Sequence, residues 1–272
     1  MVAIGMHTLA LRVAYRGAAF SGFARQPDQL TVQGELEDAL RMLLRREVET
    51  TCAGRTDAGV HAVGQVVSFD VSPDELAELD ARDDGSGRVR FASFKRSLNA
   101  ITHDDIAVRA VWQAEDGFSA RFDAKAREYR YFLSIGTTPA VLMRDFCWQV
   151  PGSATGLDVD AMHRASRCLI GERDFKSFCR AASAVDKPTC RNLMEVSFSS
   201  EEVMGEELLV IRVVGSSFLH SMVRTIVGTL VDVGRGRHAE EWVAEALAAQ
   251  DRAAAGECAP AQGLVFWNVR YE

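Results

Sequence analysis

Asp57, in the string CAGRTDAGVHAVGQ, is the residue of this chain whose surroundings are most typical of a catalytic group. Gly54 and Gly59 can adopt backbone conformations that other residues resist, and the apolar segments on both sides are typical of strands. Asp57 is therefore predicted to project from a tight loop on a rigid sheet, where its carboxylate could meet a ligand. The same residues are also typical of an Asx turn, and the loop alone does not distinguish the two interpretations.

Several other chemistries lack the residues that they need. The string GRTDAG has the glycine spacing that opens a P-loop, but Val60 and His61 stand where Lys and Ser or Thr are required. There is no GxSxG and no HExxH string, and the six histidines and six cysteines show no spacing typical of metal ligands. No metal is expected, the cysteines are predicted to be reduced structural thiols, and His61 and His220 receive no role.

Length and composition indicate a globular protein. With 272 residues, 47% of them hydrophobic, the chain can bury one large core or two smaller ones. No apolar run is long enough to span a membrane, and the start MVAIGMHTLALRV lacks the features of a signal peptide. We therefore expect a cytoplasmic protein that does not bind a membrane.

The formal charge of −7 argues at first against a nucleic-acid partner. The acid is concentrated in two runs, at 74–84 and 201–207, and the rest of the chain is slightly basic. Both runs are predicted to be solvated surface: the first leads into the stretch DDGSG, and the second fits a hairpin turn. A basic surface elsewhere on the molecule is therefore compatible with the overall charge.

The segment RFDAKAREYRY, at 121–131, gathers four basic side chains with aromatic residues between them. Such a pattern could meet both bases and phosphates of a nucleic acid. It is equally typical of an amphipathic strand with one charged face. The pattern alone leaves both interpretations open.

The order of expected elements indicates the fold class. Strands and helices are mixed without a regular βαβ rhythm, which favours an α+β fold with a mixed, largely antiparallel central sheet flanked by helices. A break near 115–117 predicts two α+β halves, at 1–115 and 116–272, with the Asp57 loop in the first. Strands are expected near 9–15, 66–71, 106–112, 129–135, 196, 208–214 and 264–271, and helices near 32–43, 158–170, 218–234 and 242–249.

Six further motifs, in the same order along the chain, make the sequence resemble the tRNA pseudouridine synthase A family. They accompany the string AGRTDAGVH and extend over nearly the whole chain, so they favour a functional Asp57 over a simple turn. The motifs are YRGAAFSGFARQ at 15–26, TVQGELEDAL at 31–40, ARFDAKAREYRY at 120–131, GERDFKSF at 171–178, FLHSMVRTIVGTL at 218–230 and AQGLVFWNVRY at 261–271.

The resemblance implies the pseudouridine-synthase fold, with two similar halves and a cleft between them, and an isomerase that converts uridine to pseudouridine in the anticodon arm of tRNA. The conventional targets are positions 38, 39 and 40. Because the N1–C1′ bond is exchanged for a C5–C1′ bond without oxidation or loss of a group, no cofactor is required. A glycosidase, in contrast, uses a second acid to admit water. The resemblance also implies a homodimer in which one tRNA touches both subunits.

The resemblance carries site roles to five residues. Asp57 is the nucleophile, and it must be ionised although closure of RNA over it would raise its pKa. Arg55 and Arg224 are candidates to hold that charge, with phosphate binding as the alternative. Tyr129 is expected to contact the flipped base and could accept the C5 proton if its pKa fell from the usual value of about 10. Leu264 is expected to pack against the base, or only in the core.

Four positions depart from the pattern of the family. Arg16 replaces an acidic residue, Phe23 and Ala24 replace Trp and Gln, and Ser221 replaces a histidine.

Two other function classes also stay open: a non-catalytic RNA-binding protein, which would not need Asp57, and a glycoside hydrolase, which would need a second acid. The atom that Asp57 attacks is not determined by the sequence.

Overall fold

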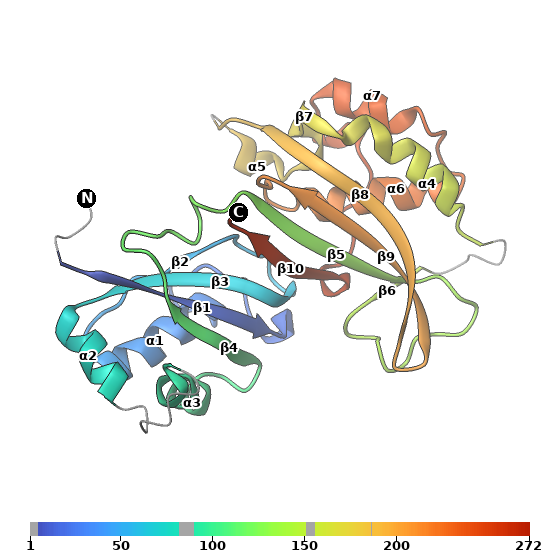
Figure 1. The fold of residues 1–272 in the computed structure, drawn as a ribbon. Helices are drawn as coiled ribbons and strands as arrows, with labels where there is room; N and C mark the ends of the chain where they lie inside the picture. Colours follow the sequence, from blue (N-terminus) through green and yellow to red (C-terminus); the bar gives the residue numbers. More distant parts are fainter. Residues whose placement is uncertain (1–4, 82–89, 151–155, 186) are drawn as a thin grey trace. The chain divides into compact units, whose positions relative to one another are not determined.

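The chain folds into two compact units. The structure, a computed structural model, describes residues 5–81, 90–150, 156–185 and 187–272. Unit 1 comprises Met1–Lys125 and Phe266–Glu272, and unit 2 comprises Ala126–Val265. Figure 1 follows the chain through both units, and each is described by itself below.

Unit 1 contains an antiparallel sheet built around its first strand. The central strand β1 pairs with β3 on one side, where Leu11 lies opposite Val67, and with β4 on the other. Its residues from Thr8 to Tyr15 are buried on both faces except Arg12, and His7 at its start is half-buried. The strand order is β4, β1, β3, β10, with β2 also paired to β3. The bounds are β1 His7–Tyr15, β2 Thr51–Cys52, β3 His61–Val71, β4 Ile106–Gln113 and β10 Leu264–Arg270.

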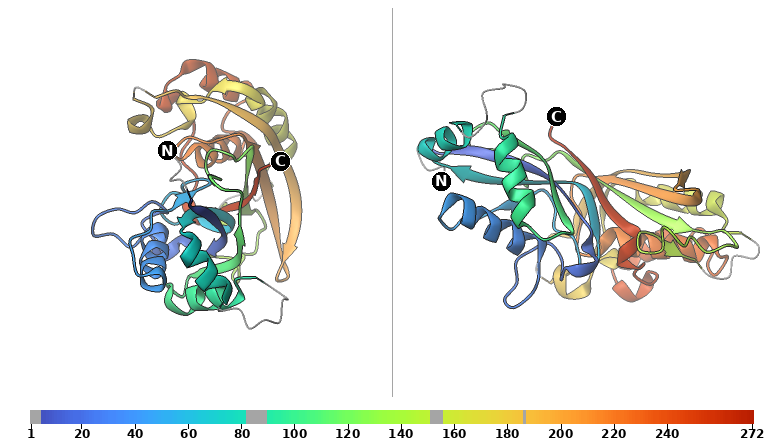
Figure 2. Two further views of the ribbon diagram at one scale, coloured as in Figure 1. Left: turned by 60° about the vertical axis from the view of Figure 1, so that its left-hand side comes forward. Right: turned by 90° about the horizontal axis from the view of Figure 1, so that it is seen from below.

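The helices of unit 1 are α1 (Val32–Leu44), α2 (Pro73–Ala81) and α3 (Ala92–Ile101). Helix α1 starts as the sequence predicts, because the Thr31 hydroxyl caps it by accepting a hydrogen bond from the Gly34 amide. In Figure 2, α1 and α3 cover one face of the unit 1 sheet. Helix α2 lies in the acidic run that was expected to be plain surface, and it buries two leucines there. The rest of that run, 82–84, lies outside the described residues.

The strands of unit 2 pair mainly antiparallel, in the order β5, β9, β8, β7. The short strand β6 runs parallel to β5, which makes the pairing mixed. Strands β8 and β9 form the predicted hairpin, and its turn at Met204 and Gly205 has positive φ at both residues. The bounds are β5 Ala126–Ser134, β6 Trp148–Gln149, β7 Gly171–Asp174, β8 Cys190–Val203 and β9 Glu206–Gly215.

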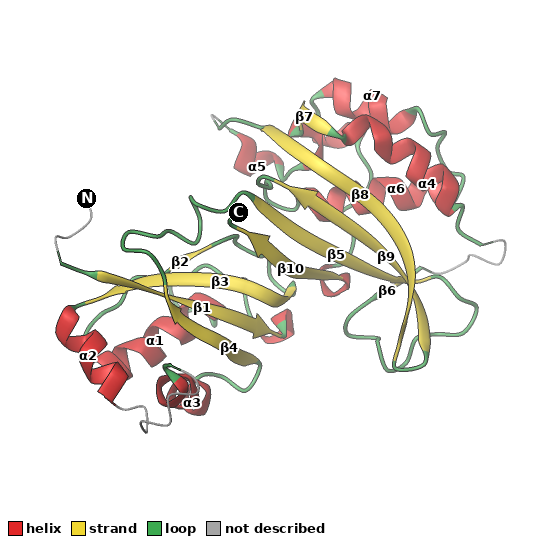
Figure 3. Ribbon diagram, viewed as in Figure 1, coloured by secondary structure: helices red, strands yellow, loops and turns green. Residues whose placement is uncertain are grey.

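The helices of unit 2 are dominated by α6, which is buried over most of its length. It begins at Met222 and not at 218 as expected. Ser221 has a left-handed backbone conformation, which a right-handed helix cannot include, so the helix cannot extend further toward 218. Figure 3 shows the helices in red. They are α4 Val159–Ser166, α5 Ala181–Ala184, α6 Met222–Gly234 and α7 Trp242–Ala249. The short 3₁₀ helices of unit 2 are η2 Arg167–Leu169, η3 Lys176–Phe178, η4 Arg252–Ala254 and η5 Ala261–Gly263, and η1 Gly17–Ala19 belongs to unit 1.

These elements confirm the α+β class with largely antiparallel pairing. The division of the chain differs from the expected one at 115, since 116–125 belong to unit 1. The reason is local: the Gly117 amide donates to the Thr8 hydroxyl, and the Lys125 amide donates to the Arg270 carbonyl. These bonds hold 116–125 and the end of the chain in unit 1.

Candidate active site

The Asp57 loop, residues 53–60, joins β2 to β3 in unit 1 and is fastened to β3 at its base. The Ala53 amide donates to the Val66 carbonyl at 2.9 Å. The side-chain amide of Gln65 donates to the Gly54 carbonyl at 2.6 Å, and Gln65 itself is 0% exposed. Because a buried amide must be hydrogen-bonded, Gln65 fixes the start of the loop firmly.

The middle of the loop is held through hydrogen bonds of Thr56 with Tyr15 of β1 and with Phe23. The hydroxyl groups of Thr56 and Tyr15 lie 2.8 Å apart and form a buried hydrogen bond. Burial raises the pKa of Tyr15, against the opposite effect of its hydrogen bonds with Thr56 and Gln65, so its hydroxyl stays protonated. The Thr56 carbonyl also accepts a hydrogen bond from the Phe23 amide at 3.1 Å. Thr56 is thus bound through both its side chain and its backbone.

Asp57 follows directly and is half-buried, while Arg55 is exposed. The Asp57 carbonyl accepts a hydrogen bond from the Val60 amide at 3.2 Å, and Gly59 between them has a φ of +80°. The loop therefore contains a backbone turn from Asp57 to Val60, which is distinct from the Asx turn of the Asp57 side chain that the sequence also suggested. A turn at this place does not exclude a catalytic carboxylate, since it fixes the backbone that carries Asp57.

Gly17 and His61 close the far end of the loop. The Gly17 amide donates to Nδ1 of His61 at 3.0 Å, and His61 is buried. A Cβ atom at Gly17 would lie 2.0 Å from the Val60 carbonyl oxygen, so only glycine fits there. His61, which the sequence left without a role, supports the loop.

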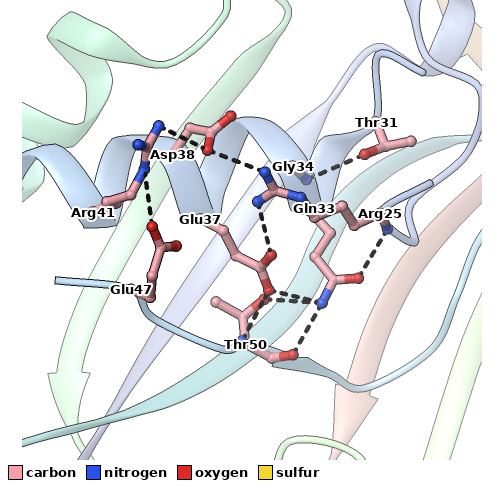
Figure 4. Close-up of polar contacts among 9 residues, drawn as sticks. All are labelled: Arg25, Thr31, Gln33, Gly34, Glu37, Asp38, Arg41, Glu47 and Thr50. Atoms are coloured by element: carbon pink, nitrogen blue, oxygen red, sulfur yellow. Dashed lines mark hydrogen bonds and ion pairs between the residues drawn. The ribbon is translucent and has the colours of Figure 1, made fainter. Parts of the chain in front are cut away.

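A further layer of polar contacts holds the segment that carries Phe23 (Figure 4). The Gln33 amide donates to the Phe23 carbonyl. The Gln33 side chain accepts from the Arg25 amide at 3.1 Å, a contact that Figure 4 shows. Glu37 accepts hydrogen bonds from Gln33 at 2.9 Å and from the Thr50 amide at 3.0 Å. Phe23, which stands where the family pattern has Trp, is fully buried and keeps this backbone bridge between α1 and the Asp57 loop.

In unit 2, Arg224 binds the segment that leads to Leu264. Its Nε donates to the Ala259 carbonyl at 2.7 Å, and the Ala259 amide donates back to the Arg224 carbonyl at 3.1 Å. The Tyr131 hydroxyl donates to the neighbouring Pro260 carbonyl at 2.7 Å. Leu264 follows as a buried residue at the start of β10. Arg224 and the Leu264 segment are therefore brought together within unit 2.

Tyr129 lies on the same strand as Tyr131, two residues away and hence on the same face of β5. It is 6% exposed and packs edge-to-face against Phe218, with ring centroids 5.1 Å apart. Burial raises the pKa of Tyr131, and the positive charge of Arg224 opposes this effect. Tyr129, Arg224 and Leu264 thus belong to unit 2, whereas Asp57 and Arg55 belong to unit 1.

The basic segment at 121–131 is divided by the structure. Residues 121–125 form a loop of unit 1, and 126–131 form part of β5 in unit 2. Arg127 is buried and donates to the Ser216 carbonyl. For this second part, the amphipathic-strand interpretation is correct.

Arg130 belongs to a set of charges that we call the sheet charge cluster: Glu128, Arg130, Glu195, Glu201 and Arg212. Arg130 and Arg212 each place Nε 3.0 Å from the Glu128 carboxylate. Arg130 also pairs with Glu201, and Arg212 with Glu195. Burial disfavours ionisation of Glu128, but the hydrogen bonds from Arg212 and Arg130 outweigh burial and lower its pKa. Glu201, in the second acidic run, is thus an ion-pair partner and not plain surface.

Sequence reasoning missed Tyr15, Thr56 and Gln65 as the supports of Asp57. A signal was present, because Gln65 is a polar residue inside a strand whose neighbours are apolar. Its hydrogen bonds could not be read from the sequence, since Gly54 and Tyr15 approach it only through strand pairing.

Metal-binding groups, membrane-spanning helices and cysteines bear on other function classes. Within the described ranges, no group of three or more His, Cys, Asp or Glu side chains is arranged to hold a metal ion. In the same part of the chain, none of the helices has the length and apolar character needed to cross a membrane. The six cysteines are all free thiols, and Cys52, Cys147 and Cys179 are buried.

Comparison with known proteins identifies the family. A sequence profile described as tRNA pseudouridine synthase matches residues 12–123 and 165–272. Proteins named tRNA pseudouridine synthase A are similar over nearly the whole chain: that of Geobacillus sp. (strain WCH70) is 38% identical and covers 96% of both chains. That of Bacillus subtilis (strain 168) is 40% identical over 97% of this chain and 99% of its own. The chain therefore belongs to the tRNA pseudouridine synthase A family and is an isomerase.

Proposed function

We propose that this protein isomerises uridine to pseudouridine in the anticodon arm of tRNA, at positions 38, 39 and 40, with Asp57 as the nucleophile. Family membership supports the reaction class. The observation that carries the assignment of Asp57 is the way its loop is held. Tyr15 and the Phe23 amide bind Thr56, Gln65 binds Gly54, and the Val60 amide closes the turn that starts at Asp57. Such preorganisation is what a reacting group requires.

The reaction makes modest chemical demands. The N1–C1′ bond of uridine breaks, the detached uracil turns, and C5 bonds to C1′; C5 then loses a proton and N1 gains one. Substrate and product are isomers, so no water, oxidant or group carrier is consumed. One ionised carboxylate is enough to trap the reacting centre, whereas hydrolysis would require a second acid for water.

We assign supporting roles to four other residues. Arg55, exposed beside Asp57, and Arg224 would favour the ionised form of Asp57 or bind the phosphates that flank the target. Tyr129 would contact the flipped uracil and take up the C5 proton at the end of the reaction. Leu264 would pack against the same base. Base stacking of about 1–3 kcal/mol would offset much of the few kcal/mol needed to flip a nucleotide.

The proposal includes a cytoplasmic homodimer that binds one tRNA with both subunits. The support is electrostatic: the chain carries a formal charge of −7, while phosphate recognition needs a concentrated basic surface. Two subunits would join their basic segments along one substrate. Light scattering of the protein with and without tRNA measures this assembly directly.

The test is base-resolved pseudouridine mapping of an unmodified tRNA after incubation with the full chain, without added metal or cofactor. The wild type is expected to modify the anticodon arm, and Asp57→Asn is expected to lower the rate by at least about 10³-fold, as for loss of a nucleophile. The matched control is Asp104→Asn, the same chemical change at an exposed aspartate, which should act like the wild type. Thermal unfolding of each variant shows that it is folded.

Each alternative gives a different result. Binding of tRNA without any pseudouridine would indicate a non-catalytic RNA-binding protein. Release of free uracil would indicate a hydrolase. Full activity of Asp57→Asn would refute the role assigned to Asp57 even if the wild type modifies tRNA.

A further inference from the structure

Residues 256–264, which we call the support segment, hold the side chain of Arg224 in unit 2. Nε of Arg224 donates to the Ala259 carbonyl at 2.7 Å, and the Ala259 amide donates back to the Arg224 carbonyl at 3.1 Å. A guanidinium group is rigid and planar, so a hydrogen bond at Nε also fixes the orientation of its two terminal nitrogens. The position of Ala259 therefore sets the direction in which Arg224 presents its charge.

The first anchor of the support segment is Thr229 of α6, which is 0% exposed. Its hydroxyl accepts a hydrogen bond from the Gly256 amide at 3.0 Å. The segment then lies directly on the helix, because a Cβ atom at Gly228 would be only 1.9 Å from the Glu257 carbonyl oxygen. The start of the support segment is thus packed against the backbone of α6.

The second anchor is Tyr131 of β5, which is also 0% exposed. Its hydroxyl donates to the Pro260 carbonyl at 2.7 Å, on the residue next to Ala259. Its ring lies against the backbone further on, since a Cβ atom at Gly263 would be 2.6 Å from two of the ring atoms. Trp148 packs edge-to-face with the same ring, at a centroid distance of 6.3 Å. The fixed ring therefore directs its hydroxyl to the carbonyl beside the one that binds Arg224.

Tyr131 has no means of reaching a substrate itself. Its side chain is fully buried, and its hydroxyl is engaged with the Pro260 carbonyl. Burial raises the pKa of Tyr131, so this hydroxyl stays protonated and continues to donate. Any effect of Tyr131 on the reaction must therefore pass through the groups that it holds in place, and of these Arg224 carries the charge.

We propose that Tyr131 is a positioning residue for the isomerisation: its hydroxyl fixes the support segment, so that the Ala259 carbonyl keeps Arg224 in the orientation required in the reacting complex. This inference rests on the proposed function, in which Arg224 favours the ionised form of Asp57. Thr229 serves the same end at the start of the segment. Loss of either hydroxyl leaves Arg224 in place and charged, but lets the carbonyl that orients it move.

The experiment measures the single-turnover rate of pseudouridine formation in an unmodified tRNA, with the full chain at saturating concentration. Tyr131→Phe removes the hydroxyl and keeps the ring, and we expect the rate to fall about tenfold. Binding of the same tRNA, measured in an Asp57→Asn background, should be unchanged. A normal rate at saturation, or a loss confined to tRNA binding, would overturn the proposal.

Variants of Thr229 test the other anchor independently of Tyr131. Thr229→Val keeps the branched shape but loses the acceptor of the Gly256 amide, so it should also lower the rate. Thr229→Ser keeps the hydroxyl and should react like the wild type. Equal rates for the two variants would contradict the role assigned to this hydroxyl.

The matched control is Ser166→Ala in α4. It removes another buried hydroxyl of unit 2 that donates to a backbone carbonyl, that of His163 at 2.8 Å. Urea unfolding should show a loss of stability similar to that of Tyr131→Phe, while the rate stays unchanged. If Ser166→Ala slowed the reaction as much as Tyr131→Phe, the effect would be one of general stability and the proposal would be wrong.

An Arg224→Met background tests whether Tyr131 acts through Arg224. With no guanidinium left to orient, Tyr131→Phe should cause no further loss of rate in this background. The same tenfold loss with and without Arg224 would show that Tyr131 acts by another route, and the proposal would fail.

Hydrogen exchange of the Ala259 amide tests the structural step without catalysis. This amide should exchange faster in Tyr131→Phe than in Ser166→Ala, because its segment has lost an anchor, and equal exchange would overturn the proposal. If the wild type forms no pseudouridine, the proposed function is refuted and the inference falls with it. If the wild type is active and Tyr131→Phe is equally fast, only the inference is refuted.

Discussion

The Asp57 loop and the sheet charge cluster both bring polar side chains together, but they satisfy them in different ways. In the cluster, Glu128 is 14% exposed and receives two arginines, so its charge is neutralised within unit 2. Around Asp57, the supporting bonds are between neutral groups: Tyr15 with Thr56, Gln65 with Gly54, and Gly17 with His61. The ionisable side chains of that loop, Asp57 and Arg55, lie at its accessible side.

The difference shows that a dense group of charges is a poor indicator of a site. Charges that pair with one another stabilise a sheet and leave little for a ligand. The Asp57 loop is instead supported by neutral hydrogen bonds of its neighbours, which fix the backbone that carries the carboxylate. The basic segment at 121–131 spans two kinds of surroundings, since Arg130 belongs to the cluster and Arg121 is exposed on a loop.

Among variants that leave Asp57 itself in place, the largest effect is expected from Gly17→Ala. The new Cβ would meet the Val60 carbonyl at 2.0 Å and displace the end of the Asp57 loop. We expect a loss of about 3 kcal/mol in the free energy of unfolding, as for overpacking of a tight site. A loop shift of about 1 Å should also lower kcat about 100-fold. Urea unfolding and pseudouridine formation measure the two effects.

The matched control is Gly136→Ala in unit 2, where the added Cβ would be in ordinary contact with the Thr138 carbonyl oxygen at 3.7 Å and its amide nitrogen at 3.9 Å. It should leave both measurements unchanged. If Gly17→Ala retained full activity, the claim that activity requires a fixed Asp57 loop would be wrong.

A smaller effect is expected from Tyr15→Phe, which removes one hydroxyl and leaves the buried Thr56 hydroxyl without this partner. The cost should be about 1–3 kcal/mol of unfolding free energy, the range for a buried polar group that loses its hydrogen bond. Activity should fall about tenfold, less than for Gly17→Ala, because the Thr56 carbonyl keeps its bond to the Phe23 amide.

The double variant Tyr15→Phe with Thr56→Val tests the cause. It removes both partners of the bond, so it should be more stable than the sum of the two single variants predicts. Additive losses would show that the bond between the two hydroxyls contributes little.

The smallest effect on activity is expected from Glu128→Gln, since the cluster contributes to stability and not to chemistry. The pKa of Glu128 is lowered in the folded state, so its stabilisation is present above the ordinary glutamate pKa and is lost as pH falls through the folded value. At pH 7 the variant should lose about 2 kcal/mol, the scale of hydrogen bonds to a charged group.

Unfolding curves at pH 7 and at pH 3 to 4 check this sign. The difference between wild type and variant should shrink in acid, and kcat at pH 7 should be equal. Glu75, whose pKa is also lowered, by its hydrogen bond with Arg46, is present in both proteins and so cancels from the comparison. A large loss of kcat in Glu128→Gln would break the distinction between the two regions.

The sequence predicted most elements because their signals are local. The apolar spacing located α1, and the hairpin of β8 and β9 followed from a short polar turn between two apolar runs. Helix α2 was missed because its acidic residues are typical of a surface loop. Only the structure shows that Leu76 and Leu79 are buried, so that one face of α2 packs on the rest of unit 1. The start of α6 was misplaced because the backbone of Ser221 cannot be inferred from its side chain.

By itself, the sequence determined the family, the α+β class and the candidate residues Asp57, Arg55, Tyr129, Arg224 and Leu264, since motif and periodicity are properties of neighbouring residues. The tertiary structure decided which residues support Asp57 and which charges are consumed by pairing. Tyr15 meets Thr56 across 41 positions of the chain, and Arg130 meets Glu201 across 71. Such contacts depend on strand register and packing, which are set by the whole fold and not by any one segment.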